Sequence, residues 1–291
     1  VKYYPKESLE EKNMENILRT LYQERASFPS TLGVLLIEGT EHSDAVTDTF
    51  DYILLIITDE DNKNLLVKQY EAKEQKIGLH IVNKYQLKDW LMKGTNRKIF
   101  DWLFQGKILF DRNDYLHSLI QELNDFPFHE RKIRIGLEFA KLIRRYHDGR
   151  QLFEQKHFMD AFNHVTHSLH HLGRLSLIEK GFQPEVTVWN QVKTIEPEIY
   201  KMYRELLYSE ESLEKRLELL FLVSDFFIHS KTELGAGHIL DTLNEKQQWS
   251  IQEILDHNEL KMYGIDIFIV LEYLVQKEFI NVTLEESKSK V

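Results

Sequence analysis

The 291-residue sequence contains no cysteine. This absence excludes disulfide bonds, zinc sites with thiolate ligands and thiol nucleophiles, and it is typical of proteins from a reducing compartment. No apolar run reaches the roughly 18 consecutive residues that a transmembrane helix needs. Residues 1–13 are rich in charge and carry no signal-peptide core. We therefore expect a cytoplasmic protein without a membrane partner.

The sequence has fewer basic than acidic residues. It contains 37 Lys and Arg residues and 47 Asp and Glu residues, which give a formal net charge of −10 at pH 7. A field of this sign opposes sequence-independent binding to a phosphate backbone. Nucleic acid is therefore not an expected partner, although a local basic patch is compatible with the total charge.

Several widespread catalytic motifs are also missing. The sequence has no G-x-x-x-x-G-K-[ST] phosphate loop, no G-x-G-x-x-G dinucleotide turn, no G-x-S-x-G elbow and no H-E-x-x-H zinc helix. The reaction classes that depend on these motifs are disfavoured.

Residues 1–126 mix helical periodicity with short apolar runs, which predicts a first domain of α/β or α+β type. The segment 52–57 is apolar at every position, as expected for a strand that is buried on both faces. Residues 62–76 fit either a helix or an irregular strand. We expect strands at 34–37, 52–57, 78–82 and 107–110, and helices at 5–26, 87–91, 98–103 and 115–123.

From residue 127 onward the pattern is helical, and two further domains are expected, a bundle at 127–234 and a small domain at 235–291. Asp148-Gly149 and Gly181 with Pro184 indicate helix ends. Gly235-Ala236-Gly237 is interpreted as a flexible joint. The expected helices are 130–146, 153–179, 195–207, 212–230, 238–245, 250–256 and 265–279. A short strand at 280–283 would complete a winged helix-turn-helix.

One stretch of the first domain carries residues suited to phosphate chemistry. Gly39 follows an apolar strand, where a glycine lets backbone N–H groups approach a phosphate closely, and Thr40 adds a hydroxyl donor. Asp51 begins the next apolar strand, where a carboxylate can hold Mg²⁺. Nucleotidyl and phosphoryl transfer need this metal-held charge more than covalent help from the protein.

This arrangement resembles the signature of the nucleotidyltransferase superfamily, and in particular of its kanamycin nucleotidyltransferase-like members. The segments GLHIV, FQGKILFDRNDYLHSL, GLEFAKLIRR and SLHHLGRLSL extend the likeness over about residues 30–180. The resemblance implies a mixed-sheet nucleotidyltransferase-type domain followed by an all-helical bundle. With the winged-helix-like domain read from the C-terminal helices, the expected fold class is α+β. The resemblance also implies Mg²⁺ as cofactor, Glu138 as general base and a homodimer as one expected assembly.

The sequence departs from that family pattern at two of the three metal carboxylates. Asp51 matches the first, but Ile53 occupies the second position and His80 the third. A metal held by a single carboxylate depends on substrate and water for its remaining ligands, and each ~1.4 kcal/mol of lost transition-state stabilisation slows the reaction tenfold. Replacement ligands could come from Asp44, Asp48, Asp59 or Asp61. The pattern predicts a degenerate active site.

A basic stripe marks the first helix of the second domain. Arg134, Lys141 and Arg145 lie near one helix face, with Glu138 beside them. In an acidic protein such a stripe indicates a site for a nucleotide or another anionic small molecule. The alternative is a salt-bridged surface helix in which Glu138 is a solvated edge residue.

Two further patterns bear on metal binding and on DNA binding. His164, His167 and His171 share a helix face, but no additional ligand follows at metal-site spacing, so packing or solvated histidines are the default. Residues 236–291 hold five Lys or Arg and ten Asp or Glu, and the segment 264–280 is apolar nearly all round, which argues against DNA binding.

The sequence thus predicts a nucleotidyltransferase-like protein with lost or weakened metal-dependent transfer, in which Asp51 holds the metal, Gly39, Thr40, Arg134 and Lys141 bind the nucleotide and Glu138 acts as base. The alternative function is a non-catalytic, nucleotide- or anion-binding regulatory module. A DNA-binding regulator is a third, less supported reading.

Overall fold

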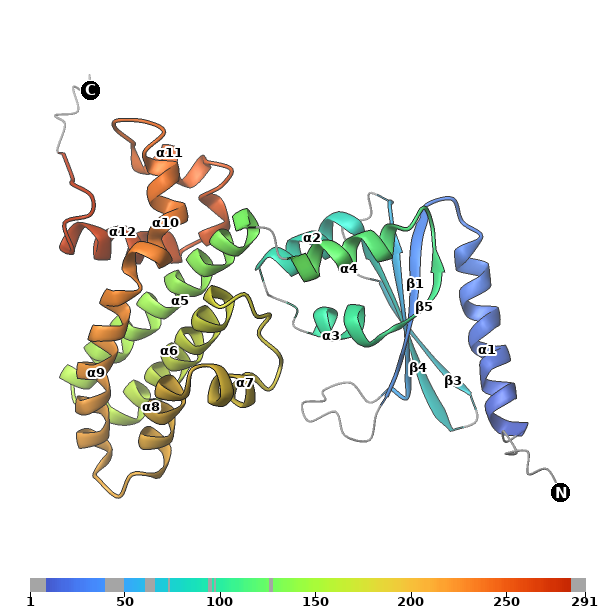
Figure 1. The fold of residues 1–291 in the computed structure, drawn as a ribbon, viewed down its shortest axis with the longest axis horizontal. Coiled ribbons are helices and arrows are strands. Elements are labelled where there is room, and N and C mark those ends of the chain that lie inside the picture. Colours follow the sequence, from blue (N-terminus) through green and yellow to red (C-terminus); the bar gives the residue numbers. More distant parts are fainter. Residues whose placement is uncertain are drawn as a thin grey trace, which may run out of the picture. The chain divides into compact units, whose positions relative to one another are not determined.

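The computed structural model describes residues 9–39, 50–60, 66–72, 74–93, 96, 98–125 and 128–283. The chain divides into two compact units. Unit 1 comprises residues 1–127 with 185–187, and unit 2 comprises residues 128–184 with 188–291. Figure 1 shows the mixed sheet of unit 1 and the helices of unit 2.

Unit 1 is built on a five-stranded mixed sheet in the order β3-β4-β2-β1-β5. The strands are β1 (Thr31–Glu38), β2 (Tyr52–Thr58), β3 (Leu66–Ala72), β4 (Gln75–Asn83) and β5 (Lys107–Asp111). The central pair β2 and β4 is parallel, and the other pairs are antiparallel.

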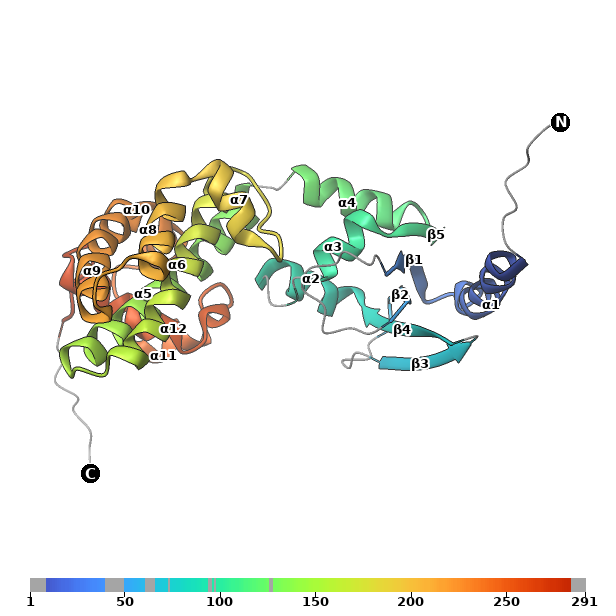
Figure 2. The same cartoon turned by 90° about the horizontal axis from the view of Figure 1, so that it is seen from below.

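Helices cover both faces of this sheet (Figures 1 and 2). On one face α2 (Lys84–Lys93), α3 (Lys98–Gln105) and α4 (Tyr115–Asp125) pack over Leu55 and Ile57 of β2. On the other face α1 (Leu9–Ala26) packs over Leu54 and Ile56. Because successive side chains of a strand point to opposite faces, burial on both faces requires the unbroken apolar run that β2 carries.

The expected strands and helices of unit 1 are present in the described residues, and residues 5–8 of the first expected helix lie outside them. The ambiguous segment at 62–76 contains β3, an edge strand whose side chains are exposed from Leu66 to Glu71. Only its neighbour β4 constrains this strand, which is why its sequence lacks a clear apolar alternation.

The described residues of unit 2 form helices and no strand, and the all-helical bundle predicted for 127–234 lies within this unit. The unit contains α5 (Phe128–Glu154), α6 (Phe158–Glu179), α7 (Val188–Ile195), α8 (Pro197–Tyr208), α9 (Leu213–Ser230), α10 (Thr232–Leu243), α11 (Ile251–Asp256) and α12 (Asp266–Gln276), with a 3-10 turn at Lys261–Tyr263. The long helix α5 is central, because α6, α10 and α12 all pack against it. The short helix α7 was not expected from the sequence.

Three expectations for unit 2 are wrong. Gly149 does not end a helix but lies inside α5, where a Cβ would approach the Cβ of His164 to 3.2 Å. Gly235 and Gly237 do not form a joint but lie inside α10, close to α5. Residues 280–283 form no strand. In the first two cases glycine permits close helix packing, which outweighs its low helix propensity.

No helix in the described part of the chain combines the length and apolar character that a membrane crossing requires.

Candidate functional site

Gly39 and Asp51, two of the predicted site residues, are adjacent at the end of β1 and the start of β2. The backbone N–H of Gly39 donates to the carbonyl oxygen of Asp51 at 2.7 Å. The carboxylate of Asp51 is exposed, and its Oδ2 accepts a hydrogen bond from the backbone N–H of Lys76 at 2.7 Å. Asp51 therefore joins the start of β2 to the start of β4 while its second oxygen remains available to a ligand.

Gly39 is required at its position by the strand pairing itself. A Cβ there would lie 2.9 Å from the carbonyl oxygen of Phe50, which is closer than Cβ atoms normally approach oxygen. The absence of a side chain therefore has a structural cause whether or not a phosphate binds. Thr40, Asp44, Asp48 and Asp61 lie outside the described residues.

The residues at the second and third carboxylate positions of the superfamily pattern, Ile53 and His80, are packed into the core and are not metal ligands in the pattern's sense. Ile53 is 6% exposed and His80 is 9% exposed, on the sheet face that α2, α3 and α4 cover. The His80 ring meets Trp102 edge-on at 5.1 Å and Phe50 at 6.1 Å between ring centroids. Asp59 forms an ion pair with Lys84 just beyond the opposite end of β2, so it cannot replace the missing ligands near Asp51.

Among the described residues, one group has the composition and spacing of a metal site: Asp111, Asp114 and His117. Asp111 is already engaged, because its Oδ1 accepts from the backbone N–H of Leu116 at 2.8 Å and its Oδ2 lies 2.6 Å from Nδ1 of His117. These contacts hold the first turn of α4, and we interpret the group as a helix cap.

The predicted residues of the helical unit form a buried ionic network between α5 and α6. Glu138 is 4% exposed. Its Oε1 accepts from Nε of Arg174 at 3.0 Å, and its Oε2 lies 2.7 Å from Nδ1 of His171. Nζ of Lys141 lies 4.0 Å from Oε1 of the same carboxylate. Glu138 therefore faces three nitrogen-bearing side chains at once.

Arg134 extends this network toward the turn that follows α6. Its side chain is buried, and its Nη1 donates to Oε1 of Gln183. Burial lowers the pKa of Arg134 to about 10, against the opposing effect of the Glu138 charge. The reading of this stripe as a solvated surface helix is therefore wrong for Arg134 and Glu138, because both side chains are covered by the packing of α5 within the unit.

The electrostatics of Glu138 argue against the expected general-base role. Burial alone would raise the pKa of this carboxyl group. The charge of Arg174 and the hydrogen bond from His171 outweigh that effect and hold the pKa well below its usual value. A carboxylate with so little affinity for a proton is a poor base at neutral pH. In the structure the carboxylate of Glu138 contacts Arg174 and His171, and both contacts fit a positioning role.

Sequence reasoning missed Arg174 and Gln183. A signal for Arg174 was available, since the segment 172–178 is otherwise made of small or apolar residues and the structure buries all of it. An arginine in such a segment requires a buried anionic partner. No comparable signal marks Gln183, which follows the Gly181 turn.

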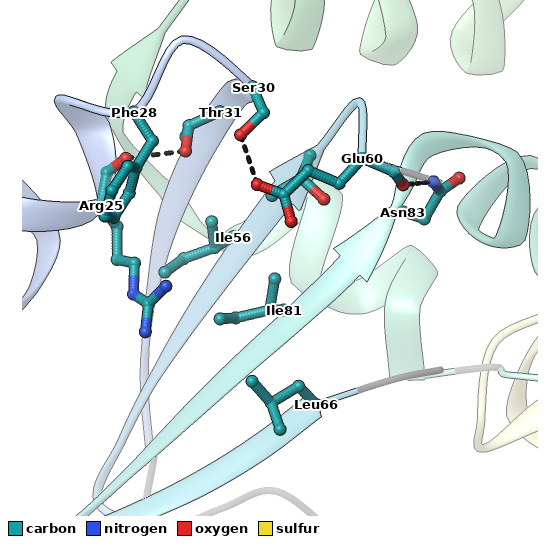
Figure 3. A pocket seen from close by; sticks show the side chains of 10 residues that line it. Arg25, Phe28, Ser30, Thr31, Ile56, Glu60, Leu66, Ile81 and Asn83 are labelled. Atoms are coloured by element: carbon teal, nitrogen blue, oxygen red, sulfur yellow. Dashed lines mark hydrogen bonds between the residues drawn. The ribbon is translucent and has the colours of Figure 1, made fainter. Parts of the chain in front are cut away.

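A cavity of about 200 Å³ lies in unit 1 between the end of α1 and the carboxyl ends of β2 and β4 (Figure 3). Two of its hydroxyl groups are already hydrogen-bonded: the Ser30 hydroxyl donates to Glu60 at 2.6 Å, and the Thr31 hydroxyl donates to the carbonyl oxygen of Arg25 at 2.7 Å. Asp51 lies at the opposite end of β2, so this cavity is separate from the predicted site. The lining residues are Arg25, Phe28, Ser30, Thr31, Ile56, Thr58, Glu60, Leu66, Ile81 and Asn83.

Comparisons with known proteins assign a family to each part of the chain. Residues 14–131 match a family described as nucleotidyltransferase-like. Residues 132–231 match the YgxA-like substrate binding domain, and residues 237–291 match a helix-turn-helix domain. These matches, together with the mixed sheet, confirm the predicted α+β fold class.

Two relatives span nearly the whole chain. The uncharacterized protein YgxA of Bacillus subtilis (strain 168) is 50% identical over 277 residues, which cover 95% of this chain and 94% of that protein. The crystal structure of a nucleotidyltransferase-like protein from Exiguobacterium sibiricum 255-15 has a TM-score of 0.83 and 37% identity, and the match covers 96% of each chain.

Proposed function

The chain belongs to the YgxA-like family of nucleotidyltransferase-like proteins, and from this membership we propose that it binds a nucleotide or another small anionic ligand while its metal-dependent transfer is weakened or lost. This proposal keeps the ligand class that the fold suggests. It treats ligand binding and nucleotidyl transfer separately. Unit 2 carries positive charge suited to binding an anion, whereas unit 1 has one carboxylate for a catalytic metal.

The observation that carries the proposal is the excess of positive charge around Glu138. Arg174 and Lys141 bring two cationic groups to the Glu138 carboxylate, and the buried Arg134, which also interacts with Glu130, adjoins Arg174. Buried like charges repel one another strongly, so a bound anion would stabilise this arrangement. The network lies in the region matched by a substrate binding domain family, which fits a ligand-recognition role.

The argument against efficient transfer rests on the surroundings of Asp51. Nucleotidyltransferases typically depend on metal, and Mg²⁺ prefers several oxygen ligands in near-octahedral geometry. Asp51 would supply one oxygen, whereas Ile53 and His80 supply no carboxylate. Mg²⁺ held at Asp51 would therefore depend on the phosphates of the nucleotide and on water, and it would bind weakly.

Calorimetric titration of the full chain with ATP, CTP, GTP and UTP, each with Mg²⁺ and with EDTA, tests the proposal. We expect at least one nucleotide to bind in EDTA and Lys141→Gln to weaken that binding several-fold. Lys201→Gln, which removes an exposed lysine of α8, is the matched control and should leave the affinity unchanged. Failure of every nucleotide to bind under both conditions would overturn the proposal.

A retained transferase is the second candidate, and the pairing of Gly39 with Asp51 favours it. The two residues are adjacent, and the exposed carboxylate of Asp51 would be able to face a nucleotide and its metal, although the Gly39 N–H is already bonded to the Asp51 carbonyl oxygen. This candidate predicts that binding requires Mg²⁺ and is abolished by Asp51→Asn. The same titrations therefore distinguish the two functions. Nucleotide affinity that is unchanged both by removal of Mg²⁺ and by Asp51→Asn excludes the transferase.

A further inference from the structure

Arg174 carries a buried donor that the protein does not use. The side chain is 2% exposed, its Nε bonds to Glu138, and its Nη1 is buried without a hydrogen-bond acceptor among the described residues. More than about 90% of buried polar groups in native proteins are hydrogen-bonded, and an unmade bond costs about 1–3 kcal/mol, more for a charged group. This guanidinium nitrogen is therefore a candidate donor to an acceptor that comes from outside the chain.

Gln183 carries a second buried donor of this kind. Its Oε1 accepts from Arg134, which fixes the orientation of the side-chain amide, and its Nε2 is buried without an acceptor in the described part of the chain. Arg134 interacts electrostatically with both Glu138 and Arg174, so Gln183 and Arg174 belong to one network. Two unused donors, from α6 and from the turn after it, therefore adjoin the same excess of positive charge.

We propose that Nη1 of Arg174 and Nε2 of Gln183 donate hydrogen bonds to an oxyanion of the ligand, a phosphoryl or carboxylate group. Such a group fits because its oxygens only accept hydrogen bonds and its charge balances the cations. A neutral hydroxyl or an amine would leave the excess charge in place. The inference rests on the proposed function and deepens it, because it assigns the recognised group and two further recognition residues.

This oxyanion site requires no metal. Glu138 is occupied by Arg174 and His171, and the positive charge comes from side chains of unit 2 alone. We therefore expect the oxyanion to bind in EDTA and after substitution of Asp51.

The inference is tested by titrating the full chain with inorganic phosphate and, in parallel, with acetate in EDTA. Saturable binding of phosphate alone would identify a phosphoryl group as the ligand, and binding of acetate alone would identify a carboxylate. Gln183→Glu replaces the donor with a negatively charged acceptor and should weaken binding of the effective probe at least tenfold. Gln155→Glu makes the same change at an exposed residue of unit 2 and should leave the affinity unchanged.

Arg174→Lys provides a second variant, because lysine keeps the charge but lacks the planar fork of donors. We expect it to weaken oxyanion binding, and if circular dichroism shows that it does not fold, Gln183→Glu decides the question. Unchanged affinity in Gln183→Glu overturns the inference, whereas nucleotide binding that depends on Lys141 would still support the proposed function. Absence of binding by all nucleotides, phosphate and acetate overturns both.

Discussion

Arg174 donates from Nε to Oε1 of Glu138 at 3.0 Å, and both side chains are buried between α5 and α6. The pair joins the two helices that form the largest contact in unit 2. A buried ion pair is retained only when its partners are well aligned, because the desolvation of two charges offsets most of their attraction. Its principal effect is to make each partner costly to remove.

We expect Glu138→Gln to lower the free energy of unfolding by about 3–5 kcal/mol, because it leaves the Arg174 charge buried without a counter-charge. Guanidinium denaturation at pH 7 measures this change. If the dependence of the unfolding free energy on guanidinium concentration is the same in the variant and the wild type, the two unfold to similarly exposed states. Glu154→Gln removes an exposed ion pair with Arg150 and should have a much smaller effect. Equal destabilisation by the two substitutions would contradict the assignment of Glu138 to a buried ion pair.

The same carboxylate should make stability depend on pH in the acid range. The pKa of Glu138 in the folded protein is held well below the ordinary value of 4.5. The ionised group therefore contributes its full stabilisation above pH 4.5, and this contribution is lost as the pH falls through the folded-state pKa. The difference in unfolding free energy between the wild type and Glu138→Gln should narrow below pH 4.5. Denaturation at pH 7, 5, 4 and 3 tests this, and a widening difference would refute it.

Two glycines in α10 should respond oppositely to alanine. A Cβ at Gly235 would lie 2.3 Å from the ring of Phe139, so Gly235→Ala should destabilise the protein by about 1–3 kcal/mol through overpacking. A Cβ at Gly237 would meet only the flexible end of Lys132, at 3.1 Å, so Gly237→Ala should be neutral or stabilising by up to about 1 kcal/mol. Thermal denaturation of the pair measures the contrast, and similar melting temperatures would show that α10 does not pack on α5 as described.

Asp51 should contribute to stability even without a metal. Its Oδ2 accepts from the backbone N–H of Lys76, and loss of one such bond typically costs about 0.5–1.5 kcal/mol. Asp51→Ala should lower stability by that amount in EDTA, and Asp51→Asn should lose less because its amide oxygen can still accept. A melting temperature of Asp51→Ala equal to that of the wild type would remove this structural role.

The apolar core of unit 1 could be predicted from the sequence because its signals are local. The unbroken run in β2 and the short runs that became β1, β4 and β5 locate the sheet without any knowledge of distant contacts. The two faces of the sheet follow from strand alternation alone.

The burial of Glu138 could not be predicted in the same way. Its partners His171 and Arg174 are 33 and 36 residues distant in the sequence, and only the packing of α6 on α5 brings them near. The helix end predicted at Gly149 and the joint predicted at Gly235 are wrong for a related reason. Glycine signals a helix end locally, whereas here neighbouring helices occupy the space of the missing side chains.

Helix α5 also joins the helix-turn-helix domain to the rest of unit 2. Phe139 of α5 is fully buried, with Gly235 of α10 against it and Tyr273 of α12 edge-on at 6.1 Å. One turn from the ionic network, Gly136 leaves room for the hydroxyl of Tyr263, which is 2.8 Å from Nδ1 of His238. The regions matched by the two families in unit 2 therefore share one buried core of side chains. A chain shortened to residue 231 would expose Phe139. Calorimetry of the intact chain should therefore show residues 132–231 and 237–291 unfolding in a single cooperative transition.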